Sequence, residues 1–162
     1  RHSNIMSDLV KYDYKGFKLG EKKAIRAHEA EAGGYVEKIV GHLGADWKVV
    51  FDWESFTKCE DPAKRLKLGE WIYQGHLKGL ADEVCGMDEE IVEALNDGVG
   101  DNKTITWALG DDGESYKECN DTFRVEGLEN GVRIVVRPRY GLGSSYKYPQ
   151  GDGLKGFILK NC

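Results

Sequence analysis

The sequence predicts a single α+β domain. It is expected to hold an antiparallel sheet of four to six strands, with two long helices and one short helix packed on one face. Three observations indicate this class. Apolar residues recur at helical spacing through much of 21–97, residues 46–56 alternate apolar and charged side chains, and an Asn130-Gly131 pair separates two strand-like runs. At 162 residues one domain is expected, 6–162, after a tag or cloning remnant at 1–5.

The N-terminal part begins with a short alternating run, residues 9–19, that predicts a brief strand or an extended arm. From residue 21 onward, apolar side chains return every three or four positions as far as Leu43, and Gly44 follows as a helix-ending glycine. A long helix is therefore expected here. Gly33-Gly34 predicts a kink or a late start, because an interior helical glycine costs about 1 kcal/mol relative to alanine.

Residues 46–56 give the clearest strand pattern. Trp47, Val49, Phe51 and Trp53 occupy alternate positions, and the residues between them are mainly charged. Successive side chains of a strand point to opposite faces. The pattern therefore predicts a half-buried antiparallel strand.

Two more helices are expected in the middle of the chain. Asp61 can cap a helix that has Pro62 in its first turn, and that helix runs to Gly86 with Cys85 on its apolar side. Asp88 can cap a third, short helix that stops before Gly98.

The C-terminal third is expected to be sheet. Residues 103–109 alternate, and 121–128 and 132–137 flank Asn130-Gly131, a pair typical of a tight hairpin turn. A loop is expected at 141–153 and a last short strand at 156–160.

Composition narrows the function classes. The chain is 40% hydrophobic and 31% charged, which favours a globular domain over a disordered one. No stretch approaches 18 apolar residues, so no membrane span is expected, and no signal-peptide core follows the first methionine. The four cysteines lack metal or redox spacing, which favours reduced thiols and a cytoplasmic location. A net charge of −5 makes nucleic acid an unlikely main partner.

No nucleotide, metal or nucleophile motif is present, so no cofactor and no metal are expected. Asp52 and Glu54 are candidate acid/base residues, since they share one face of the predicted strand about 7 Å apart. The alternative is a solvated outer face. His42 and His76 are further weak candidates for general acid/base chemistry.

The preferred site candidate is a strand face rich in arginine and tyrosine. Arginines at every second position share a strand face. Such a face can bind a phosphate, a carboxylate or a single strand of nucleic acid, with tyrosines stacking on the bases. Its proposed members are Arg133, Arg137, Arg139, Tyr140 and Tyr146. The alternative is an arginine ladder paired with carboxylates across the hairpin, for example Glu126 or Asp121.

Three function hypotheses follow. The first is a small soluble binding domain that takes a small molecule or an anionic partner, on the arginine face or in a pocket between sheet and helices. The second is a small enzyme that uses Asp52, Glu54 or a histidine. The third is a protein-interaction or inhibitor domain that acts through the acidic segment 81–97, whose charge of −7 contrasts with +5 in 131–162. That contrast also predicts a homodimer in which the acidic helix contacts the basic strand face.

Overall fold

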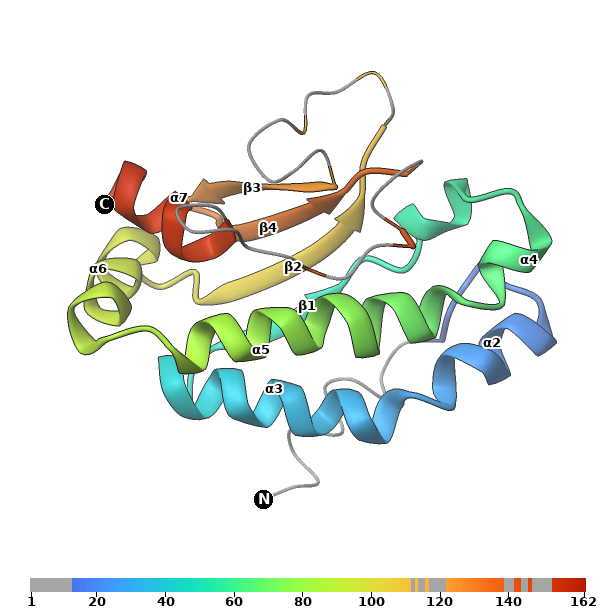
Figure 1. The fold of residues 1–162 in the computed structure, drawn as a ribbon, viewed down its shortest axis with the longest axis horizontal. Coiled ribbons are helices and arrows are strands. Elements are labelled where there is room, and N and C mark those ends of the chain that lie inside the picture. The colour runs from blue at the N-terminus through green and yellow to red at the C-terminus, as the bar shows by residue number, and fades with distance from the viewer. Residues whose placement is uncertain are drawn as a thin grey trace.

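Figure 1 shows the computed structural model of the chain, in which a sheet lies against long helical segments. The structure describes residues 13–111, 113, 116, 122–138, 142–143, 146 and 153–162. Among these residues no helix is both long and apolar enough to cross a membrane.

The sheet has four strands in the order β1-β2-β4-β3. They are β1 (Lys48–Phe51), β2 (Thr104–Leu109), β3 (Phe123–Leu128) and β4 (Gly131–Val136). β1 pairs with β2 and β2 with β4 in parallel, and only β3 and β4 are antiparallel.

The predicted antiparallel sheet is therefore wrong, and the sheet is mixed. The alternating pattern misled the prediction because any strand with one solvated face shows it, whatever the direction of its neighbour. The better signal was the long helical segment between β1 and β2. Such a crossover is what joins two parallel strands, whereas a tight turn suffices for an antiparallel pair.

The helices outnumber the three that the sequence predicts. The described part contains α2 (Leu19–Arg26), α3 (Glu29–Leu43), α4 (Pro62–Arg65), α5 (Lys78–Cys85), α6 (Glu89–Val99) and α7 (Gly153–Asn161). A short 3₁₀ helix, η1 (Ser55–Lys58), follows β1, and a π-helix, η2 (Glu70–Leu77), leads directly into α5.

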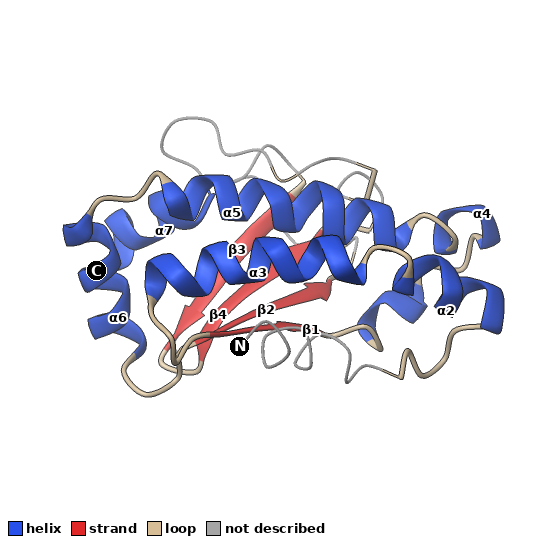
Figure 2. Cartoon of the chain, turned by 90° about the horizontal axis from the view of Figure 1, so that it is seen from below, coloured by secondary structure: helices blue, strands red, loops and turns tan. Residues whose placement is uncertain are grey.

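Two layers make up the molecule. Figure 2 shows α3 and α5 side by side across one face of the sheet. The helix-facing side chains of the strands form the core, with Phe51, Trp107 and Ile134 each no more than 1% exposed. Phe51 stacks on Trp107 with ring centroids 5.5 Å apart, a contact that contributes about 0.5–1.5 kcal/mol beyond area burial. On the opposite face of the sheet no helix lies among the described residues.

Several element boundaries differ from the expectations. The strand predicted at 46–56 ends at Phe51, although Trp47 and Trp53 are buried as predicted. The first long helix is interrupted by a turn at Ala27 and His28, and it continues through both interior glycines. Residue Cys85 is exposed, so its predicted place in the core is wrong.

The segment 156–160, predicted as a strand, belongs to helix α7. Leu154 and Ile158 are both buried, and their spacing of four places them on one helical face. The apolar run at 156–160 was too short for its periodicity to distinguish a helix from a strand.

The predicted hairpin is confirmed. Glu129 and Asn130 join β3 to β4, and Gly131, the first residue of β4, has a φ of +83°. A side chain is disfavoured there for two reasons. A positive φ favours glycine, and an added Cβ would lie 2.7 Å from the Thr104 carbonyl oxygen.

The N-terminus of α7 is held by a carboxylate from α5. Glu83 is 5% exposed and accepts hydrogen bonds from the Leu154 amide at 3.0 Å and the Tyr146 hydroxyl at 2.5 Å. It thereby satisfies a backbone donor that a helix N-terminus leaves without an intrahelical partner. Burial raises the pKa of Glu83, and these hydrogen bonds act in the opposite direction.

Candidate functional site

The candidate site lies where β1 leaves the sheet. β1 and β2 run in parallel, so both strands end at the same edge, at Phe51 and Leu109. In open α/β sheets, ligands characteristically bind beyond the carboxyl ends of the parallel strands. Asp52 and Glu54, the carboxylates that the sequence singled out, follow β1 at this edge.

Ser55 fixes the position of the two carboxylates. Its hydroxyl donates to the Asp52 carbonyl oxygen at 2.6 Å and accepts from the Leu109 amide at 2.8 Å. Its amide donates to the Asp52 carboxylate at 3.2 Å. These bonds tie the first turn of η1 to the end of β2, so the chain turns away after Phe51. Asp52 and Glu54 therefore extend from a turn, and they are not successive residues of one strand face as predicted.

A second segment, residues 13–16, closes the other side of the site. The Phe17 amide donates to the Tyr14 carbonyl at 3.1 Å, and the Lys15 amide donates to the Asp13 carboxylate at 3.0 Å. Tyr14 has a φ of +54°, a conformation that non-glycine residues rarely adopt. Arg65 anchors this turn by donating to the Gly16 carbonyl at 2.7 Å. The turn places Asp13 and Lys15 beside the end of β1.

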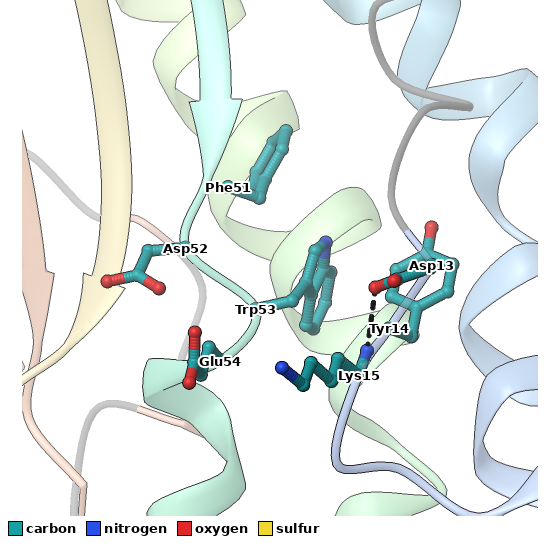
Figure 3. A pocket seen from close by; sticks show the side chains of 7 residues that line it. All are labelled: Asp13, Tyr14, Lys15, Phe51, Asp52, Trp53 and Glu54. Atoms are coloured by element: carbon teal, nitrogen blue, oxygen red, sulfur yellow. Dashed lines mark hydrogen bonds between the residues drawn. The ribbon is translucent and has the colours of Figure 1, made fainter.

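The two segments border an open pocket of about 240 Å³. Side chains of both contribute to its lining, and Figure 3 shows them: Asp13, Tyr14, Lys15, Phe51, Asp52, Trp53 and Glu54. Phe51 and Trp53 lie on one side of the pocket. Because Trp53 is 3% and Tyr14 1% exposed, these rings mainly set the shape of the pocket.

The charges around the pocket are unbalanced. Three carboxylates face one ammonium group, a formal charge of −2. In Figure 3 the Lys15 side chain extends toward Glu54, while the carboxylates of Asp52 and Glu54 lie on the same side of Trp53. Among the described residues, none forms an ion pair with Asp13, Lys15, Asp52 or Glu54.

A chain of buried polar groups runs beneath the pocket. The Trp53 indole N–H donates to the Tyr73 hydroxyl at 3.0 Å, the Tyr73 and Tyr14 hydroxyls are 3.1 Å apart, and Tyr14 donates to Glu29. An indole N–H can only donate and an ionised carboxylate can only accept. Because the Tyr14 hydroxyl donates to Glu29, Tyr73 donates to Tyr14, and the chain of hydrogen bonds runs in one direction from the segment after β1 to α3.

Tyr14 remains a protonated phenol in this setting. Burial, followed by its contacts with Tyr73 and Glu29, raises the pKa of Tyr14 far above its ordinary value. Its hydroxyl therefore stays a hydrogen-bond donor to Glu29, and this bond helps to fix the position of the pocket wall.

The predicted arginine face lies on the helix-free side of the sheet, and its described members have partners. Arg133 lies 3.6 Å from Glu126 on β3, the pairing expected for an arginine ladder. Glu126 also pairs with Arg124 at 3.0 Å. Sequence reasoning missed Arg124, which a period-2 count along β3 would have placed on the same face as Glu126.

The remaining residues predicted for the arginine face do not lie together. Arg137 and Arg124 both lie over the Tyr116 ring, 5.8 and 5.2 Å from its centroid. Tyr146 lies elsewhere, buried against α5 and bonded to Glu83. Arg139 and Tyr140 lie outside the described residues.

The two histidine candidates lie away from the pocket lining. The ring of His42 is bonded to the Met87 carbonyl oxygen at 2.8 Å, between α3 and the start of α6. His76 is fully buried in η2, and its ring packs edge-on against Phe123. Of the four catalytic candidates, the structure brings together Asp52 and Glu54.

The carboxylates of the acidic segment 81–97 are exposed, with one exception. Its exposed acids lie on α5, α6 and the turn between them: Asp82, Asp88, Glu89, Glu90, Glu93 and Asp97. Glu83 is the buried member and supports α7. Two of the exposed acids occupy the first turn of α6, where the helix dipole favours negative charge.

Comparisons of this chain with protein-family models, with curated proteins and with solved structures found no match in any of the three.

Proposed function

We propose that this protein is a binding domain whose ligand occupies the pocket at the carboxyl end of β1. One observation carries the proposal: the pocket combines a preformed cavity of about 240 Å³ with charged side chains that no described residue neutralises. Ligand sites are typically concave and apolar with a few well-placed polar groups. Phe51 and Trp53 supply the apolar part here, and the carboxylates supply the polar part.

The ligand is small. Pockets for drug-sized molecules enclose roughly 300–1,000 Å³. This pocket, at about 240 Å³, suits a compound of a few heavy atoms or a single side chain of a larger partner.

Screening by NMR tests this function. A library of small polar compounds is added to the uniformly ¹⁵N-labelled protein, and the amide signals of Asp52, Trp53 and Glu54 are followed. The proposal expects a subset of compounds to shift these signals in a saturable way. If every hit maps to another part of the molecule, such as α6, the pocket is not the ligand site.

An acid/base enzyme is the second candidate, and the shared rim position of Asp52 and Glu54 favours it. Two carboxylates beside one cavity can divide the roles of acid and base. Any compound that binds is incubated with the protein, and its own spectrum is followed. Turnover that falls about 10²-fold or more in both Asp52→Asn and Glu54→Gln supports catalysis. An unchanged spectrum after prolonged incubation leaves binding as the function.

The surface roles predicted from charge remain proposals. An anionic partner on the arginine face would have to compete with Glu126 for Arg133, so that site has less support than the pocket. An acidic partner surface on α6 and a homodimer that joins α6 to the strand face rest on charge alone. Light scattering at low and high salt tests the homodimer, because charge-driven contacts weaken as screening rises.

A further inference from the structure

We infer that the ligand of this pocket is an organic cation that carries one or two ammonium groups, and that Lys15 competes with it from within the chain. This inference rests on the proposed binding function and adds the ligand class. It is carried by the sign of the pocket charge and by the direction of the Lys15 side chain.

The charge of the pocket and the placement of its carboxylates disfavour two ligand classes, an anion and a metal ion. With Asp13, Asp52 and Glu54 against Lys15 alone, an anion would meet three carboxylates. A bound metal ion needs three or four converging ligands, and among the described residues no three His, Cys, Asp or Glu are so placed. An organic cation needs neither a positively charged lining nor three converging ligands. It can pair with separate carboxylates of the lining, as partly exposed ion pairs do.

Lys15 already presents an ammonium group to this site. Its backbone is held by the Asp13 carboxylate at 3.0 Å, and its side chain extends across the pocket toward Glu54 (Figure 3). The absence of an ion pair between Lys15 and any described carboxylate leaves that ammonium free to move aside. An incoming ammonium of the ligand would therefore take the place that Lys15 now approaches.

The size and charge of the pocket suggest a matched set of probes. A four-carbon diamine fits within about 240 Å³, and its two charges balance the formal −2 of the lining. 1,4-Diaminobutane, 1,4-butanediol and succinate have chains of similar length and carry charges of +2, 0 and −2. Differences among them therefore report charge selection.

The test is an NMR titration of the full chain with each probe. We expect 1,4-diaminobutane to shift the amides of Asp52, Trp53 and Glu54, and to bind at least about fivefold more tightly than the diol or succinate. Raising the salt concentration should weaken the binding of the diamine more than the binding of the neutral diol.

Four variants then separate the roles of the charges. Asp52→Asn and Glu54→Gln are each expected to weaken diamine binding about two- to fivefold, the range for partly exposed ion pairs. Lys15→Gln is expected to strengthen it by a similar factor, because the internal competitor is removed. Lys67→Gln, at an exposed position outside the pocket lining, is the control and should leave binding unchanged.

The outcomes distinguish this inference from the proposed function. If the diol or succinate shifts the same amides as strongly as the diamine, the pocket is a ligand site and the cation class is wrong. Weaker diamine binding in Lys15→Gln contradicts the competitor role. If no probe and no library compound shifts these amides, both the inference and the proposed function fail.

Discussion

Replacing Tyr73 with phenylalanine should destabilise the protein by about 2–3 kcal/mol. The hydroxyl that this change deletes accepts from the buried Trp53 indole at 3.0 Å and donates to Tyr14. A buried donor left without its acceptor costs about 1–3 kcal/mol, and the lost bond to Tyr14 adds about 0.5–1.5 kcal/mol. Little packing is lost, since phenylalanine keeps the ring and its edge-on contacts with Phe51 and Trp53.

Urea unfolding followed by far-UV circular dichroism measures this loss. The midpoint of thermal unfolding should fall by about 4–12 °C for a chain of this length. Tyr35→Phe is the matched control, because the Tyr35 hydroxyl donates to Glu31 in a hydrogen bond that is exposed to solvent. Tyr35→Phe should lower the free energy of unfolding by less than about 0.5 kcal/mol. Equal effects of the two substitutions would refute the idea that a buried relay supports the pocket.

The other predictions concern packing and titration. Gly79→Ala should lower the free energy of unfolding in urea by about 1–3 kcal/mol, because the added Cβ would lie 2.5 Å from the Tyr146 carbonyl oxygen. Gly41→Ala, whose Cβ would meet open space, should instead stabilise the protein by about 0.5–1 kcal/mol. Similar effects at both sites would contradict the close approach at Gly79. Glu83 has a raised pKa, so the stability it contributes is present below about pH 4 and is lost as the pH rises through its folded pKa. The advantage of wild type over Glu83→Gln should therefore shrink from pH 4 to pH 7, and a constant difference would count against burial of the charge. Tyr14 also has a raised pKa, so wild type should lose stability above about pH 10 more steeply than Tyr14→Phe, and parallel curves would contradict its buried setting.

Part of the fold was predictable from local pattern. The alternation from Trp47 to Trp53 identified the buried side chains of β1, and Asn130-Gly131 located the hairpin. Strand direction was not recovered, because it depends on which strands become neighbours and not on the pattern within one strand. The helix α7 was read as a strand because one turn of buried residues fits either period.

Only part of the candidate site could be predicted from the sequence. Asp52 and Glu54 were chosen as a pair, but the reason given, a shared strand face, fails because the strand ends at Phe51. Their actual placement comes from the hydrogen bonds of Ser55 to both β1 and β2. Lys15 joins them from a turn far away in the sequence, and no local signal marks that contact.

A crystal structure of the protein grown with 1,4-diaminobutane tests the cation pocket most directly. We expect the diamine in the pocket, with an ammonium group against the carboxylates of Asp52 and Glu54 and with Lys15 turned away from Glu54. An empty pocket at saturating diamine, with Lys15 still directed toward Glu54, would contradict the account.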